Sequence, residues 1–389
     1  NMSSGLLFIS FITRTTKPLK RYWWTSILGW ALMITPAQGS LVLRIAIQEG
    51  VKQVQIGSST KAIVRDTTGR EIGELTPNKG FAAELQSGKV ALANWISGQM
   101  WIEPSAQGYV WIGDRWYRGR THIIPHKGGI TAINYVNIEE YIYSVIGAEM
   151  SSNWPQEALK AQAVAARSYA LKKRQENINN FYDLGNDQSW QVYKGIKTES
   201  PGTYTAVDAT QGQVLTYNGQ IILALFHSSS GGHTENVEDV WSNSLPYLRA
   251  VPDFDQNAPV YQWTESFSQA ELKQRISGVG NIISMIPQTT TPHGSVITIK
   301  VLGDTGVKTI KGTDVTSALN LKSTRFIVIA KKTEGQQVPT SFQITGKGFG
   351  HAVGMSQWGA YNLARNGYNY QQILLYYYQG ATLAKIDVR

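Results

Sequence analysis

Glu149 is the residue of this sequence best placed to act as an acid or a base. It follows Gly147 and Ala148 and precedes Met150, at the end of one predicted helix and just before an alanine-rich one. A carboxyl group among small and apolar residues is partly desolvated, which raises its pKa toward the range that suits a general acid. A glutamate that only caps a helix or lies at the surface is the alternative that this feature leaves open.

A polar loop follows a predicted apolar strand, at residues 227–235 with the sequence HSSSGGHTE. Its hydroxyls, glycines and histidines offer hydrogen-bonding groups and an exposed backbone, which suit sugar hydroxyls or an acetamido group. A zinc site on His227 and His233 is an alternative, although their spacing is not that of a standard ligand set and no third ligand is evident. A turn loop without a function is the third interpretation.

A glycine-rich segment near the carboxyl terminus, residues 346–360, reads GKGFGHAVGMSQWGA. Glycines at alternating positions allow close approach of backbones. His351, Ser356 and Gln357 add polar groups at a predicted strand-to-helix junction. The segment is not a nucleophile elbow, because Trp358 stands where that motif needs glycine. It is not a dinucleotide-binding fingerprint either.

The elements that must position these residues predict an α+β fold, in which a strand-rich region at 40–135 precedes a mixed α/β catalytic domain at 136–389. A β-rich insertion is expected at about 254–332. Alternating apolar residues between turn signals predict strands in the first region. These strands are 41–47, 51–56, 62–65, 89–92 and 109–112.

Two helices are predicted around Glu149. Apolar residues at helical spacing predict the first over 138–146, and Pro155 opens a second that runs to about Glu176. The second helix has a predicted buried stripe of Leu159, Ala163, Ala166 and Ala170. Three further alanines allow other backbones to come close, namely Ala158, Ala161 and Ala165.

The remaining elements follow from turn signals and periodicity. Asn218-Gly219 predicts a hairpin between strands at 212–217 and 221–226. The insertion is expected to hold a helix at 268–276 and a strand at 296–301. The last stretch begins as a strand at Phe342 and continues into helices at 354–365 and 370–378.

Composition excludes several classes of protein. An apolar content of 42% with 16% charged residues is typical of a folded chain with a substantial core. The absence of cysteine excludes disulfides, thiolate metal sites and a cysteine nucleophile. The net charge of +9 is not organised into a dense basic run or an aromatic–basic motif, so no nucleic-acid partner is expected.

The amino terminus has the pattern of a secretory signal. Basic residues at 14–21 precede an uncharged, largely apolar stretch at 22–34, and small residues follow at Ala37 and Gly39. We expect cleavage before Ser40 and an extracytoplasmic location, in the periplasm or the cell wall. The alternative is an uncleaved anchor, whose tryptophans suit a membrane interface; it is the only membrane contact that we expect.

Taken together, these segments resemble the SpoIID/LytB domain, the family of stage II sporulation protein D and the amidase enhancers. The resemblance extends over most of the chain after the signal, including the strand-rich region from Leu41. Its motifs stand in the family's order, at 137–174, 187–195 (DQSWQVYKG), 226–241 (FHSSSGGHTENVEDVW) and 346–360.

The resemblance implies a lytic transglycosylase that cleaves the bond between N-acetylmuramic acid and N-acetylglucosamine in peptidoglycan, often on glycan stripped of stem peptides. It implies that Glu149, in the motif Ala-Glu-Met, is the catalytic acid and then base. The residues that we expect to bind substrate are Gln191, Tyr193, Ser228, Ser229, Gly231, Gly232, His233, His351, Ser356 and Gln357.

The resemblance also bears on cofactors and partners. Some members bind zinc near the Ser-Gly-Gly loop through a cysteine and a histidine, but this chain has no cysteine. We therefore expect no cofactor, with zinc on His227 and His233 as the alternative. The expected partner is the glycan strand. The alternative function is a non-catalytic, glycan-binding enhancer of a cell-wall amidase, which adds that amidase as a partner.

Overall fold

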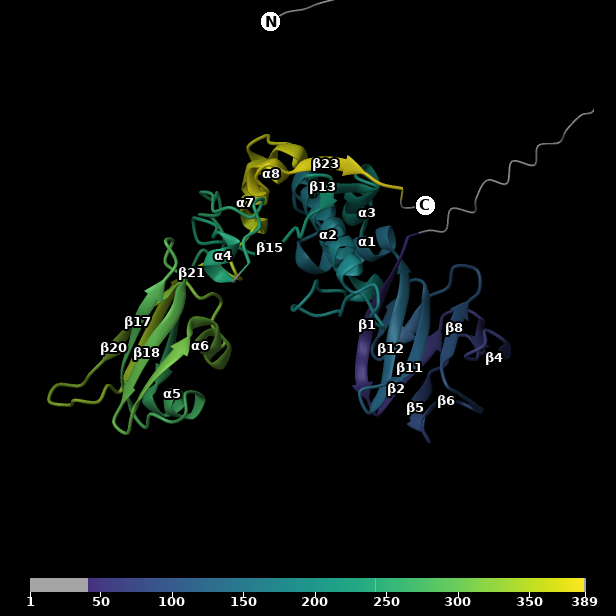
Figure 1. The fold of residues 1–389 in the computed structure, drawn as a ribbon, viewed down its shortest axis with the longest axis horizontal. Helices are drawn as coiled ribbons and strands as arrows, with labels where there is room; N and C mark the ends of the chain where they lie inside the picture. The colour runs from purple at the N-terminus through teal and green to yellow at the C-terminus, as the bar shows by residue number, and fades with distance from the viewer. Residues whose placement is uncertain (1–40, 242, 388–389) are drawn as a thin grey trace, which may run out of the picture. The chain divides into compact units, whose positions relative to one another are not determined.

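The structure of the chain is a computed structural model, and it describes residues 41–387 except residue 242 (Figure 1). The predicted signal segment at 1–39 lies outside these residues. Within the described ranges, no helix is long and apolar enough to cross a membrane.

Residues 41–137 form two six-stranded antiparallel sheets, in the orders β1-β12-β11-β8-β3-β4 and β10-β9-β2-β5-β6-β7. Both sheets contribute to one core, which holds Leu43, Ile56 and Ile102 with no exposed surface. The strand-rich region is therefore confirmed. Its strands are β1 (Val42–Val51), β2 (Gln53–Ser58), β3 (Ala62–Arg65), β4 (Glu71–Leu75), β5 (Phe81–Gln86), β6 (Lys89–Leu92), β7 (Trp95–Ser97), β8 (Met100–Pro104), β9 (Val110–Ile112), β10 (Arg115–Tyr117), β11 (Arg120–His126) and β12 (Gly129–Asn137).

Helices α1 (Ile138–Glu149) and α2 (Gln156–Glu176) follow directly. The side chain of Asn137 caps α1 by accepting a hydrogen bond of 2.8 Å from the backbone of Glu139. Helix α2 is buried on two sides. The predicted stripe of Leu159, Ala163, Ala166 and Ala170 packs in the same core as α1 and the sheets. The alanines at 158, 161 and 165 pack in a second core.

That second core contains the carboxyl-terminal helices α7 (Gln357–Arg365) and α8 (Tyr370–Tyr377), through residues such as Leu363 and Leu374. Helix α7 begins later than the predicted residue 354. Gly354 has φ of +75°, which lies outside the α-helical region, so the helix cannot begin there. A β-carbon at this position would lie 2.1 Å from the carbonyl oxygen of Leu225, so only glycine fits. Ser356 instead caps α7 by accepting from the backbone of Gly359 at 3.1 Å.

The predicted hairpin around Asn218-Gly219 is present but short. β13 (Gln213–Tyr217) pairs with β14 (Gln220–Ile221) on one side and with β23 (Thr382–Lys385) on the other, so the end of the chain closes this sheet (Figure 1). Ile222 still donates to the carbonyl oxygen of Leu215 in β13 at 3.1 Å, but residues 223–225 leave the sheet. The carbonyl oxygen of Leu225, for example, accepts from the hydroxyl of Tyr378 and the backbone of Met355.

The inserted segment has its own core, which includes Trp263, Ile299 and Ile344. It is larger than predicted, because β21 (Ser341–Lys347) pairs with both β16 (Gln262–Ser268) and β20 (Phe326–Lys331). The strand predicted to begin at Phe342 thus completes the inserted sheet. The other elements of this segment are α5 (Gln269–Arg275), β17 (Ile282–Thr290), β18 (Val296–Gly303), β19 (Val307–Lys311) and α6 (Gly312–Leu319).

Candidate functional site

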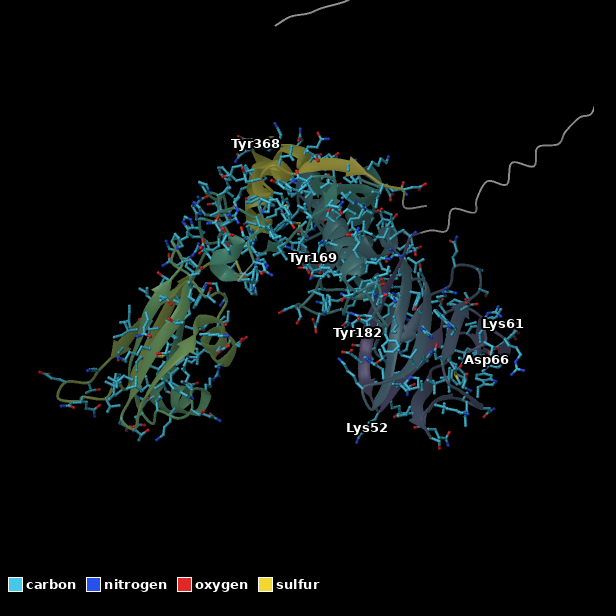
Figure 2. All side chains as sticks on the ribbon, in the orientation of Figure 1. Lys52, Lys61, Asp66, Tyr169, Tyr182 and Tyr368 are labelled. Carbon is cyan, nitrogen blue, oxygen red and sulfur yellow. The ribbon has the colours of Figure 1, made fainter. Side chains whose placement is uncertain are left out.

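A cavity of about 770 Å³ surrounds Glu149, the last residue of α1. Four parts of the chain form its wall: the end of α1 with Tyr169 of α2 (labelled in Figure 2), the segment 186–194, the loops on either side of the parallel pair β15 (Phe226–His227) and β22 (Met355–Ser356), and Arg115 of β10. Distant parts of the sequence therefore meet around one carboxyl group.

Glu149 is half-buried, and its Oε1 accepts a hydrogen bond of 2.8 Å from the backbone of Val192. Burial raises the pKa of the Glu149 carboxyl above its ordinary value. The Val192 N–H, the Gln357 amide and the Lys194 charge oppose this rise only in part. The carbonyl end of α1 also disfavours a negative charge at this position. Glu149 is therefore suited to hold a proton and release it to a substrate.

Two neutral histidines lie in the same wall, with ring centroids 5.5 Å apart. Nδ1 of His227 lies 3.1 Å from the carbonyl oxygen of Val353 and must donate to it. Nδ1 of His351 accepts from the backbone of Val353 at 3.1 Å. Burial lowers the pKa of each ring to about 3, so both are uncharged near neutral pH. Neither can replace Glu149 as a proton donor there.

Four of the residues predicted for the site line the cavity: Glu149, Ser228, His351 and Gln357. Gln357 is buried, and its amide lies 3.4 Å from the side-chain oxygen of Gln162 on α2. The carbonyl oxygen of Ser228 accepts a hydrogen bond of 3.0 Å from the backbone N–H of Trp358, which fixes the position of Ser228. The glycine-rich segment and the polar loop are thus fixed beside the glutamate.

Gln191 and Tyr193 do not line the cavity, because they face the core. The Gln191 amide donates to the carbonyl oxygen of Ala166 at 3.3 Å, and the Tyr193 hydroxyl donates to the side chain of Asn134 at 2.8 Å. Burial alternates along residues 190–194, so Gln191 and Tyr193 face the core and their neighbours do not. The neighbours Trp190, Val192 and Lys194 line the cavity instead.

The middle of the polar loop is also outside the cavity wall. Asp255 holds it by accepting from the hydroxyl of Ser229 and from the backbones of Gly231 and Gly232. His233 stacks on His293 of the inserted segment, with 3.6 Å between ring centroids. Ser356 is occupied as the cap of α7. In this structure these predicted contact residues shape the loop rather than line the cavity.

His227 and His233, the zinc ligands considered from the sequence, each have one ring nitrogen beside a backbone carbonyl oxygen. His227 uses Nδ1 on Val353, and Nδ1 of His233 lies 2.8 Å from the carbonyl oxygen of Thr234. Among the residues that the structure describes, no three histidine, cysteine or acidic side chains are grouped to hold a metal. Zinc takes four ligands in structural sites and at least three protein ligands in catalytic ones.

Several wall residues were not predicted from the sequence. Trp241 and Phe349 are large apolar side chains that are 43% and 44% exposed in this wall. Trp190 and Lys194 belong to the motif at 187–195. The motif indicated that this segment is important, but it did not show which of its residues face the cavity. Arg115 comes from the strand-rich region, where no sequence signal marked it.

Comparisons with known proteins agree on one family. Residues 126–217 match the model of SpoIID, described as a stage II sporulation protein, and residues 246–354 match a domain of unknown function, DUF8618. Stage II sporulation protein D of Bacillus subtilis is 35% identical over 328 residues, which are 80% of this chain and 89% of that protein.

Two further relatives are similar in part. An uncharacterized protein of Brachyspira hyodysenteriae is 36% identical over 69% of this chain and 72% of its own length. The amidase enhancer of Bacillus subtilis is 33% identical over 61% of this chain and 39% of its own length. The SpoIID match contains Glu149 and the segment 186–194, whereas the polar loop, the glycine-rich segment and Arg115 lie outside it.

Proposed function

The chain belongs to the SpoIID/LytB family, and from this premise we propose that it is a lytic transglycosylase of peptidoglycan. It cleaves the bond between N-acetylmuramic acid and N-acetylglucosamine, outside the cytoplasm, where this polymer lies. The observation that carries the proposal is the placement of Glu149. Its carboxyl group is half-buried in a cavity large enough for sugar rings, and burial raises its pKa.

The mechanism needs one carboxyl group. Protonated Glu149 donates to the glycosidic oxygen as the bond from that oxygen to the muramyl C1 breaks. Positive charge develops on the ring, as in other glycoside cleavages. The Glu149 carboxylate then accepts the proton of the muramyl C6 hydroxyl, whose oxygen bonds to C1 and closes a 1,6-anhydro ring. The acid is regenerated, and the Val192 N–H stabilises the carboxylate between the two steps.

The decisive test is the product. Purified protein lacking residues 1–39 is incubated with peptidoglycan, with and without stem peptides, and the fragments are identified by mass spectrometry. Muramyl ends in the 1,6-anhydro form are expected. Reducing muramyl ends would contradict the proposal, because they require water as the nucleophile.

The relative named amidase enhancer supports a second candidate function, a glycan-binding activator of a cell-wall amidase. In that case the glycan stays intact. The protein still binds it, and adding the protein to a cell-wall amidase speeds release of stem peptides. The two functions therefore differ in which bond is broken and in which protein breaks it.

The pH dependence of cleavage follows from the pKa of Glu149. The first step needs the protonated acid, so kcat is expected to fall as pH rises through the raised pKa of this carboxyl. The alkaline limb should lie above the ordinary glutamate value of about 4.3. A kcat–pH profile on soluble glycan measures it. An alkaline limb at the ordinary glutamate pKa would mean that burial does not raise the pKa of Glu149.

Trp241 is expected to provide a stacking surface for the glycan. It is 43% exposed, and its ring centroid lies 5.2 Å from that of His351 in the cavity wall. Covering part of this exposed area with a sugar contributes about 1 kcal/mol, so Trp241→Ala should weaken glycan binding roughly 5-fold. Titration calorimetry checks this. Ile286→Ala, which removes an exposed apolar side chain from β17 in the inserted segment, is the control and should leave affinity unchanged.

A further inference from the structure

Arg325, which lies directly before β20 of the inserted segment, is buried against the polar loop. It is 8% exposed. Its Nη1 donates to the carbonyl oxygens of Ser230 at 2.6 Å and of His233 at 3.0 Å. Its Nη2 donates to the carboxylate of Glu235 at 2.6 Å. One side chain of the inserted segment therefore holds three residues of the polar loop.

The inserted segment supplies two further donors to the carboxylate of Glu235. The hydroxyls of Thr291 and Ser295 each lie 2.7 Å from its Oε1, and Glu235 has no exposed surface. A guanidinium that binds a carboxylate and two carbonyl oxygens is fixed in position, because its donors form a rigid planar fork. A buried ion pair often adds no stability over apolar residues of the same size. What this pair holds in place is therefore its more informative property.

The loop that Arg325 holds is paired with the glycine-rich segment at Phe349. The backbone of Ser229 donates to the carbonyl oxygen of Phe349 at 3.1 Å, and the backbone of Phe349 donates to that of Ser229 at 2.7 Å. The next backbone N–H, that of Gly350, donates to the carbonyl oxygen of Lys322 in the inserted segment at 3.0 Å. The backbone at Phe349 is therefore held from the polar loop on one side and from the inserted segment on the other.

The ring of Phe349 is accessible although its backbone is fixed. It is 44% exposed and lies in the cavity wall. Gly350 has φ of +109°, and a β-carbon there would lie 2.9 Å from the β-carbon of His227, so the turn after Phe349 fits only glycine. An exposed aromatic ring on a fixed backbone suits stacking on a sugar, because little conformational freedom is lost on binding.

We propose that Arg325 is a positioning residue that sets Phe349 in the cavity wall, where the ring of Phe349 stacks on a sugar of the glycan. The inserted segment is then the support of one wall of the cavity. Arg325 itself is not among the residues that line the cavity, so it acts through this wall. The inference rests on the proposed function for its ligand, the glycan strand, and it applies to cleavage and to binding alone.

The first test measures glycan binding by calorimetry in a Glu149→Gln background, which prevents turnover. Phe349→Ala should weaken the binding of soluble glycan roughly 5-fold, as for losing part of an exposed ring. Arg325→Met should weaken it by about the same factor. The variant with both changes should also lose roughly 5-fold, because both remove one interaction. An unchanged affinity in Arg325→Met, or losses that multiply to roughly 25-fold, would overturn the inference.

Two further variants control for folding and for charge. Arg325→Met leaves the carboxylate of Glu235 buried without its cation, which costs stability. Adding Glu235→Gln removes that charge, and the glutamine oxygen still accepts from Thr291 and Ser295, so this variant should fold and show the same loss of affinity. Arg275→Met is the matched control, because Arg275 is exposed on α5 of the same segment. It should leave the affinity unchanged.

Cleavage kinetics separate a positioning role from a purely structural one. In the cleaving protein, Glu235→Gln with Arg325→Met should raise KM roughly 5-fold and leave kcat nearly unchanged. Glu149 is held by the backbone of Val192 and not by the polar loop, so the proton transfers do not depend on Arg325. A fall in kcat as large as the rise in KM would assign Arg325 to the fold as a whole.

NMR of the histidine rings tests the support without any glycan. Arg325→Lys keeps the charge, but a single ammonium group cannot reproduce the fork that reaches both carbonyl oxygens of the loop. The signals of His227 and His351 in the wall should therefore shift, and that of His122 in β11 should not. Unchanged signals of His227 and His351 would overturn the inference whatever the glycan does. A parent protein that binds no glycan would instead reject the proposed function.

Discussion

Replacing Glu149 with glutamine is expected to lower the rate of anhydromuramyl release from peptidoglycan by at least about 100-fold, the usual contribution of a general acid–base group. Glutamine keeps the shape of the side chain and can still accept the Val192 hydrogen bond, but it cannot donate an acidic proton. The neutral histidines of the wall offer no replacement, since their pKa values are lowered to about 3. Fragment release is measured by mass spectrometry at several pH values.

The fold of this variant can be judged independently, because the stability effect has a known sign. The pKa of Glu149 is raised in the folded protein. Its contribution to stability is therefore present below the unfolded pKa and is lost as pH rises through the folded pKa. Above that range the buried carboxylate opposes folding. Glu149→Gln should then have a Tm equal to or higher than that of the wild type at pH 8. A lower Tm would attribute the loss of activity to misfolding.

Asp187→Asn is the matched control for a mechanism with a single carboxyl group. Asp187 is the second acid of the wall, and asparagine can still accept the hydrogen bond from Ser189. A one-acid mechanism predicts that this variant keeps most of its activity. A loss as large as that of Glu149→Gln would point to two cooperating carboxyl groups, as in hydrolysing glycosidases. Activity of Glu149→Gln at the wild-type rate would reject the assignment of Glu149.

The helical part of the fold could be predicted from the sequence because its signals are local. Helix α2 is 21 residues long, and both of its buried faces follow from alanine and leucine spacing. The extent of the insertion could not be predicted in this way. Whether β21 belongs to the domain that contains Glu149 or to the inserted sheet depends on its pairing with β16, about 79 residues earlier in the chain. No local pattern specifies that partner.

In the candidate site, too, some residues could be predicted from local sequence and others depend on the tertiary fold. Glu149 was predicted from its motif, and the structure places it in the cavity. Which of its neighbours face the cavity was harder to predict, because burial alternates from one residue to the next along 190–194 and no regular element sets that alternation. Tyr193 and Lys194 therefore have opposite environments. Asp255, which holds the polar loop, and Arg115 come from segments that carry no motif, so only the tertiary fold reveals them.

Arg167→Met is expected to reduce the free energy of unfolding by about 3–5 kcal/mol, as when one partner of a buried ion pair is removed. Arg167 has no exposed surface, and its guanidinium donates to both carboxylate oxygens of Glu139 at 2.9 and 2.6 Å. It also donates to the carbonyl oxygen of Gln213 at 2.9 Å. The pair thus joins α1, α2 and β13. Urea unfolding followed by circular dichroism measures the loss.

Two comparisons show whether the pair acts as a unit. Lys173→Met on the same helix breaks a more exposed ion pair with Glu176 and should cost less than about 1 kcal/mol. The double variant Glu139→Met with Arg167→Met leaves no buried charge unpaired, so its loss should not exceed that of Arg167→Met alone. If the double variant instead lost the sum of the free energies lost by the two single variants, the two residues would not act as a pair. Because Glu139 lies in the first turn of α1 and Glu149 ends it, the folded double variant should also retain glycan cleavage if the pair serves only to hold that helix.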